Sequence, residues 1–247
     1  MLGKGIYSEF QKSKHSLFGL WHIILPIAAV VAVWLYYLGR KVSVEDEAAT
    51  FYVMLSTAMP VGIAWMTALS VGWEEDNQFY FILSAPNRSK AIYDKLITLC
   101  LFNCVTIMIA VVFEHIFVIK DTRLVVLFLF GGIVTSVNLI LYPLHLLLTF
   151  RFGKTVSLLT AFTGAIVGSL MQTGLGDQCW QWIPYSICGR VSQMVATLFY
   201  GNVAMNQRII YASEIKKAVM GVLICFVIIQ AGLLLWSRRW EGRSVTE

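Results

Sequence analysis

The chain has 247 residues, of which 58% are hydrophobic and only 13% charged, and its mean hydropathy is +0.72. Because soluble domains hold about a quarter charged residues, this composition excludes a protein built mainly of soluble domains. The formal net charge of +5 does not indicate nucleic-acid binding, since the basic residues stand in short clusters between apolar runs. Such placement is typical of residues that meet anionic lipid headgroups.

Six apolar stretches are long enough to cross a bilayer, which takes about 20 residues of helix with its backbone polar groups satisfied internally. The first follows a basic segment, as in a signal peptide, but its apolar run is too long for one, so we expect a retained helix. The sequence predicts an all-α polytopic membrane protein with a single transmembrane domain over residues 1–247. The expected spans are approximately 17–38, 51–73, 96–119, 124–150, 155–175 and 218–236.

Two further segments have the pattern of helices that lie on the membrane surface. Before the first span, Ile6 and Phe10 are four residues apart among charged neighbours, which predicts an N-terminal interfacial helix. Between the fifth and sixth spans, apolar residues repeat at helical spacing over 191–199, which predicts an outer interfacial helix. An aromatic cluster precedes it and is a candidate for contact with substrate or lipid, although anchoring at the interface explains it equally well. The cluster consists of Trp180, Trp182 and Tyr185.

The distribution of basic residues predicts the orientation of the chain. With the N-terminus in the cytoplasm, eleven of the 19 lysines and arginines fall on the inner side and eight on the outer side. This modest bias has the sense of the positive-inside rule. We expect a multi-pass protein of the cell membrane with both termini in the cytoplasm.

Motifs for chemistry are weak in this sequence. The Gly-Lys-Thr at 153–155 resembles the end of a phosphate-binding loop, but Leu148 replaces the first glycine of that motif, so we expect a basic loop. Glu114, near the outer end of the third span, is a candidate functional carboxylate because ionisable groups are costly in a membrane. In one interpretation Glu114 serves no function and simply reaches the nearby headgroup layer. In the functional alternative its carboxylate contacts substrate.

The cysteines and the glycines of the fifth span give no sign of a catalytic or metal site. Of the five cysteines, only Cys179 and Cys188 are placed to pair, and no metal-binding spacing emerges. Gly164 and Gly168 lie one turn apart in the fifth span, which predicts the close approach of another helix.

The most informative stretch, residues 74–95, connects the second and third spans. Three acids open it, which favours the N-terminus of a helix, and Pro86 ends the following turn. Phe79, Ile82 and Leu83 stand at helical spacing and form an apolar face. A solvated loop is the alternative, but it has little use for such a face. We therefore predict a short amphipathic helix on the cytoplasmic side that meets a partner protein.

With these elements placed, the chain resembles the ABC-2 family of ATP-driven transporter permeases, and within it the lantibiotic-immunity permease subunits of bacteria. The resemblance covers nearly the whole chain and rests on short motifs. They are Glu9-x-x-Lys12-x-Lys14, Trp21-His-Ile-Ile-Leu-Pro26, Tyr36-Tyr37, the segment from Glu75-x-Asn77-Gln78-Phe79 to Leu83-Ser84-x-Pro86-x-Arg88-x-Lys90, and Trp182-Ile-Pro184-Tyr185.

The resemblance implies an exporter subunit that expels a lantibiotic or similar antimicrobial peptide and so gives self-protection. It implies six transmembrane helices, an N-terminal elbow helix, a cytoplasmic coupling helix between the second and third, and outer half-helices between the fifth and sixth. The chain itself is then no enzyme and holds no cofactor, because cytoplasmic ATPase subunits bind ATP and magnesium. A second six-helix permease subunit, identical or different, completes the transporter. The residues implied to couple to the ATPase are Glu74, Glu75, Asn77, Gln78, Phe79, Ile82, Leu83 and Arg88.

Two other classes of function stay open at this point. One is a membrane-embedded enzyme that uses Glu74, Glu75, Glu114 and His115 as acids and base. The other is an ion-coupled transporter or structural subunit that needs no ATPase.

Overall fold

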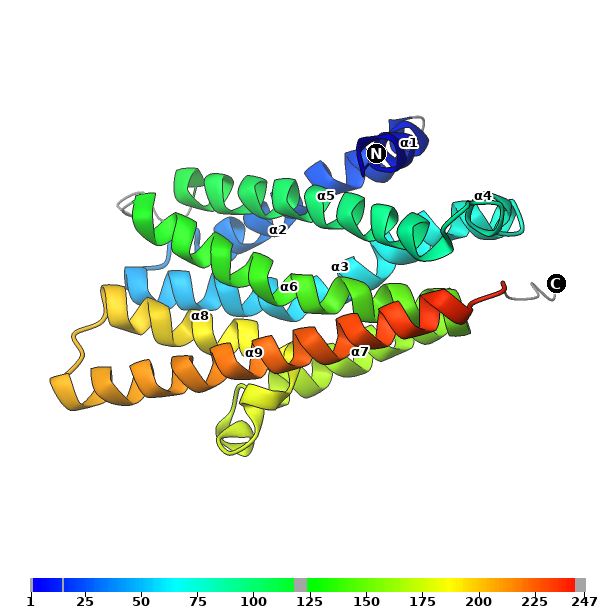
Figure 1. The fold of residues 1–247 in the computed structure, drawn as a ribbon. Coiled ribbons are helices and arrows are strands. Elements are labelled where there is room, and N and C mark those ends of the chain that lie inside the picture. Colours follow the sequence, from blue (N-terminus) through cyan, green and yellow to red (C-terminus); the bar gives the residue numbers. More distant parts are fainter. Residues whose placement is uncertain (1, 15, 118–123, 243–247) are drawn as a thin grey trace.

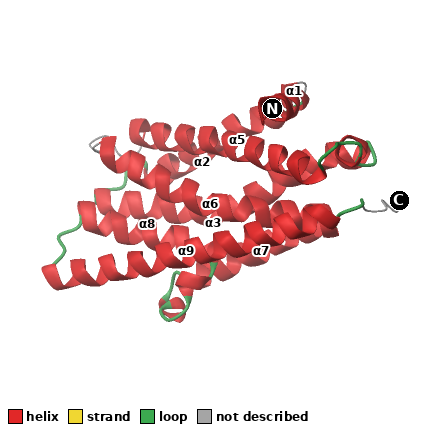
Figure 2. Cartoon of the chain, viewed as in Figure 1, coloured by secondary structure: helices red, strands yellow, loops and turns green. Residues whose placement is uncertain are grey.

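The computed structural model describes residues 2–14, 16–117 and 124–242, which form helices joined by short loops, with no strand among them (Figures 1 and 2). Among the described residues, five helices are long and apolar enough to cross a membrane. The chain is therefore an all-α polytopic membrane protein, as predicted. The five are α2 (Phe18–Tyr37), α3 (Val44–Asp76), α5 (Arg88–Phe117), α6 (Leu124–Phe152) and α9 (Met205–Arg239). The shorter elements are α1 (Leu2–Lys14), α4 (Tyr80–Leu83), α7 (Lys154–Leu170), α8 (Pro184–Tyr200), and the turns η1 (Gly174–Gly176) and η2 (Trp180–Trp182).

The long helices lie along one common axis in a bundle (Figure 1). The end of the bundle that holds α1, α4 and the last turn of α9 is called the terminal end, and the opposite end is called the far end. In Figure 1 α1 and α4 are seen nearly end-on, so both run across the bundle axis. The expected N-terminal helix is thus present.

Several helices extend beyond their apolar runs. α3 begins at Val44 because Ser43 caps it: the Ser43 hydroxyl accepts from the Asp46 amide at 3.1 Å, and three acids occupy the first turn, where the helix dipole favours them. α5 begins at Arg88 and α9 at Met205, both earlier than the expected spans at 96 and 218. Apolar content alone therefore predicts only the part of each helix that suits lipid, and not where the helix begins.

The expected fifth span, 155–175, is interrupted. α7 ends at Leu170 after 17 residues, which makes it shorter than the five long helices. Arg190 of α8 binds the chain where it leaves α7: its Nε donates to the carbonyl of Met171 at 2.8 Å, and it also bonds the carbonyl of Thr173. These bonds satisfy carbonyl groups that a continued helix would have used. α8 then runs on toward the far end (Figure 1).

The expected outer interfacial helix is present as α8, but it is buried rather than lying on the surface. Val191 and Val195 are 7% and 5% exposed and belong to a core cluster that also contains Phe51 and Tyr52 of α3. The predicted close approach at Gly164 and Gly168 is confirmed. Here the first turn of α8 packs on α7, and a Cβ atom on Gly168 would lie 2.6 Å from the carbonyl oxygen of Tyr185.

Candidate functional site at the terminal end of the bundle

Four charged side chains form a buried ion network at the terminal end. The Lys95 ammonium lies 2.6 Å from Glu9 and 3.1 Å from Glu74, and the Lys12 ammonium lies 2.6 Å from Glu9 and 2.7 Å from Glu74. Lys95 is 1% exposed and Glu74 is 0% exposed. Buried charges persist only when they are paired, and here two acids and two bases balance.

Three helices supply the network. Glu9 and Lys12 lie one turn apart on α1, Glu74 lies in the last turn of α3, and Lys95 lies in the second turn of α5. The expectation that the acids at 74–76 begin a helix is wrong, because α3 continues to Asp76. A carboxylate near a helix C-terminus is disfavoured by the helix dipole. The two lysines offset that cost for Glu74, and in doing so they fasten α1 to α3 and α5.

The charges on α1 are stabilised by their partners. Burial opposes the ionisation of Glu9, but Lys95 and Lys12 outweigh it and hold the pKa of the Glu9 carboxyl below its ordinary value of 4.5. Burial likewise disfavours the charged form of Lys12, but hydrogen bonds to Glu74 and Glu9 raise the pKa of its ammonium above 10.5. Both groups are therefore ionised near neutral pH when α1 is docked.

The chain turns sharply between α3 and α4. Gln78 and Phe79 have positive φ values of 51° and 58°, a conformation that costs free energy in residues other than glycine. The buried ring of Phe79 holds this turn, since it meets the ring of Trp240 edge-on at 5.1 Å and lies 6.0 Å from that of Phe150. Asn77 closes the end of α3, because its Nδ2 donates to the carbonyl of Trp73 at 2.7 Å.

α4 is shorter than the predicted amphipathic helix and presents a different face. Phe79 and Ile82 of the expected contact face are 1% and 3% exposed and point into the core, while Leu83 is half-buried. Tyr80 and Phe81 form the exposed side, at 67% and 53%.

The other residues assigned to this segment differ in exposure. Asn77, Gln78 and Arg88 are exposed and Glu75 is half-buried, whereas Glu74 belongs to the buried ion network. The guanidinium of Arg88 donates to the carbonyl of Trp240 at 3.2 Å, which joins the start of α5 to the end of α9.

The remaining candidates lie away from this site. Glu114 is fully buried toward the far end of α5 and accepts a hydrogen bond from the Tyr52 hydroxyl at 3.2 Å. It lies nineteen positions after Lys95 on α5, about 28 Å along the helix at 1.5 Å per residue. The structure therefore does not bring the acids at 74–75 together with Glu114 and His115, as an enzyme built on them would need.

The expected aromatic cluster is divided between core and surface. Trp180 is 1% exposed, Trp182 is 56% exposed, and the half-buried Tyr185 places its hydroxyl 3.3 Å from Nε2 of His145. A belt of three surface aromatics is thus not formed. Cys179 and Cys188 do not pair either, because all five cysteines are free.

In the sequence, Glu9 and Lys12 stand in a short motif and Lys95 stands at the end of the segment 74–95. The ion pairs that these three residues form with Glu74 and with one another were not predicted from it. A signal was present, since Lys95 directly precedes an apolar run and so has to be paired or reach water. Its partners, however, stand far away in sequence, at 86 positions in the case of Glu9. Spacing along one helix does not reveal such a contact.

Comparison with family models, with curated proteins and with solved structures finds no match to this chain. Within the described ranges, no group of three or more His, Cys, Asp or Glu side chains gathers where it could hold a metal ion.

Proposed function

We propose that this chain is the permease subunit of an ATP-driven exporter of the ABC-2 type, and that α4 is its contact with a cytoplasmic ATPase. The observation that carries the proposal is the exposed aromatic pair Tyr80 and Phe81 on a short helix whose opposite side is fixed in the core. Exposed aromatic side chains at a helix turn are typical anchors of protein interfaces.

Side-chain contacts connect α4 to the ends of several helices, and a force on α4 would be transmitted through them into the bundle. Phe79 joins α4 to Trp240 and Phe150, at the ends of α9 and α6, and Arg88 follows at the start of α5. The ion network then links α3 and α5 to α1. Displacement of α4 by an ATPase would consequently move several helices together, which is what alternating access requires.

The terminal end is cytoplasmic in this proposal, and the complete transporter contains a second six-helix permease subunit. ATP and magnesium bind to the ATPase, so the chain itself performs no hydrolysis. Its cargo is a lantibiotic or similar antimicrobial peptide removed from the outer side of the membrane, and the exposed Trp182 is a candidate for contact along the route.

The test is purification of the tagged chain from the membranes of its own host, followed by identification of bound subunits and assay of ATP hydrolysis. We expect an ATPase to co-purify. The double variant Tyr80→Ser/Phe81→Ser should lose about tenfold of the bound ATPase, together with resistance to cationic peptide antibiotics.

The matched control is Tyr7→Ser, which removes an aromatic side chain that is 64% exposed on α1 at the same end of the bundle. It should keep the ATPase. If the chain confers resistance with no ATPase bound, or if resistance survives ATP depletion and follows the proton gradient, the proposal fails in favour of an ion-coupled transporter. Loss of activity in Glu114→Gln with unchanged assembly would instead favour an enzyme.

A further inference from the structure

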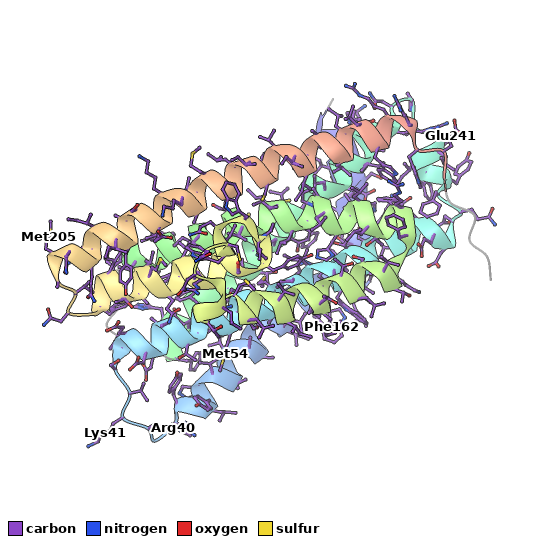
Figure 3. All side chains as sticks on the ribbon, turned by 90° about the horizontal axis from the view of Figure 1, so that it is seen from below. Arg40, Lys41, Met54, Phe162, Met205 and Glu241 are labelled. Carbon is purple, nitrogen blue, oxygen red and sulfur yellow. The ribbon has the colours of Figure 1, made fainter. Side chains whose placement is uncertain are left out.

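A cavity of about 710 Å³ opens at the terminal end of the bundle, where the last turns of α6 and α9 meet. The ring of Phe150 on α6 lies 6.1 Å from that of Trp236 on α9, so the two helices are in direct contact beside it. Figure 3 shows Glu241, which lines the cavity, just beyond the last turn of α9. The volume falls in the range of small-molecule sites, roughly 300–1,000 Å³.

One face of α9 forms a wall of the cavity and changes in character along its length. The residues of α9 that line the cavity here stand at i, i+3, i+4 and i+7, the spacing of a single helix face. They are Gly232, Leu235, Trp236 and Arg239. The first two are apolar, and Leu235 is 63% exposed. Trp236 has the amphipathic ring that is typical of the boundary between hydrocarbon and headgroups. The wall therefore passes from apolar to charged within about 10 Å of helix.

Two arginines from different helices form the charged end of the cavity. Arg239 of α9 and Arg151 of α6 both line it, and both are exposed, so their charged groups are open to a ligand. The guanidinium of Arg151 lies 5.0 Å from the ring centre of Phe152, and a stacked guanidinium keeps the N–H groups along its edge for other acceptors. Phosphate oxygens are the acceptors that a guanidinium matches best, together with carboxylates.

Trp240 gives the cavity a wall that the core holds in place. Its ring lies 5.2 Å from that of Phe150 and 5.6 Å from that of Trp236. The Arg88 guanidinium donates to its carbonyl at 3.2 Å. Contacts from α5, α6 and α9 thus fix this wall, and a fixed wall lowers the cost of ordering the protein around a ligand.

The formal charges that line the cavity sum to one positive charge. Arg151 and Arg239 contribute two, and Glu241 removes one. A ligand with one negative charge balances this sum, whereas a zwitterion leaves it uncompensated. Charges act on one another over a Debye length of about 8 Å, so both arginines attract one phosphate in the cavity without having to share an oxygen atom.

We propose that this cavity binds a membrane phospholipid with one net negative charge, such as phosphatidylglycerol. The phosphate lies at the end lined by Arg151 and Arg239, and an acyl chain follows Leu235 and Gly232 into the bilayer. The order of polarity along α9 selects a lipid over a free phosphate, because only a lipid uses both ends of the wall. The inference depends neither on the proposed export function nor on which side of the membrane the terminal end faces.

The test uses the full chain purified in detergent and native mass spectrometry to count bound lipids. Phosphatidylglycerol and phosphatidylcholine with the same acyl chains are the probes. We expect phosphatidylglycerol to bind about fivefold more tightly, which is the effect of one charge beside a basic membrane-surface residue. An excess of inorganic phosphate should not displace it, because inorganic phosphate has no acyl chain to bury against the apolar part of the wall.

Variants with matched controls locate the site. Arg239→Gln should weaken the binding of phosphatidylglycerol about fivefold. Arg238→Gln should leave it unchanged, because Arg238 is the exposed neighbour of Arg239 and does not line the cavity. Arg151→Gln should act as Arg239→Gln does, and its control is Lys154→Gln, at an exposed lysine outside the cavity. All four variants remove one positive charge from the same end of the bundle, so a general effect of charge would be equal in all.

Four results would overturn the proposal. Equal binding of phosphatidylglycerol and phosphatidylcholine would show that the charge is not recognised. Equal losses in Arg238→Gln and Arg239→Gln would show attraction to the surface at large. Displacement of the lipid by inorganic phosphate would show a site for free anions. Tighter binding of phosphatidylethanolamine, weakened by Glu241→Gln, would show a zwitterionic headgroup whose ammonium meets Glu241. In the proposed site Glu241→Gln strengthens the binding of phosphatidylglycerol instead, because it removes the one acid of the lining.

Discussion

At the scale of single residues, the buried charges of the ion network determine whether the terminal end holds together. Lys95 is 1% exposed and touches both acids, whereas Lys217 on α9 pairs with Glu214 through side chains that are 61% and 21% exposed. Removal of one partner from a buried pair leaves a charge without compensation, while an exposed pair contributes little. The two lysines thus offer a matched comparison.

We expect Lys95→Met to lower the free energy of unfolding by about 3 kcal/mol and Lys217→Met to change it by less than about 1 kcal/mol. Thermal unfolding in detergent measures both. The double variant Glu74→Gln/Lys95→Met should recover much of the loss, because it removes an acid along with the base. Equal effects of the two single variants would show that the network is open to water.

At the scale of elements, the docking of α1 depends on the ionisation of Glu9 and Lys12. The pKa of Glu9 is lowered in the folded chain, so its contribution is complete above 4.5 and is lost as the pH falls below that value. The pKa of Lys12 is raised, so its contribution is complete below 10.5 and is lost as the pH rises through the folded value. We therefore expect α1 to stay docked on α3 and α5 at pH values between these two limits.

A spin label at position 7, on the exposed side of α1, in a background without native cysteines measures this docking. We expect the label to gain mobility as the pH falls from 7 to below 4.5, and the variant Glu9→Gln to lose that acid transition. A second label at the exposed Ser136 of α6 should stay unchanged, which separates undocking of α1 from unfolding. If the mobility of the label at position 7 does not change with pH, ionised Glu9 is not what holds α1 in place.

The elements that sequence predicted well are those whose signal is local. Apolar runs found α2, α3, α5, α6 and the lipid-facing part of α9, because length and hydropathy suffice for them. The break after Leu170 was not predictable in this way, since Arg190, which binds the carbonyls there, belongs to another helix. Glu74 was misread for the same reason: a local dipole argument put it at a helix start, but a lysine 62 residues away holds it at a helix end.

At the scale of the whole molecule, α1 and the last turn of α9 lie at the same end of the bundle. The proposed function depends on which side of the membrane this end faces. Figure 3 shows Met205 and Glu241 at opposite ends of α9, with Arg40 and Lys41 toward the end that holds Met205. Asn77, next to α4, is exposed at the terminal end, and Met205 is 73% exposed at the far end. The two positions therefore report on opposite sides of the membrane.

The proposed export function requires the terminal end to face the cytoplasm, where an ATPase could reach Tyr80 and Phe81. In a background without native cysteines, we expect a membrane-impermeant maleimide to label the variant Met205→Cys in intact cells. The variant Asn77→Cys should react only after lysis. The reverse pattern would put α4 outside the cell, and it would remove the ATPase contact while leaving the fold untouched. The bias of basic residues toward the terminal end favours the first outcome, since lysine and arginine are retained on the cytoplasmic side.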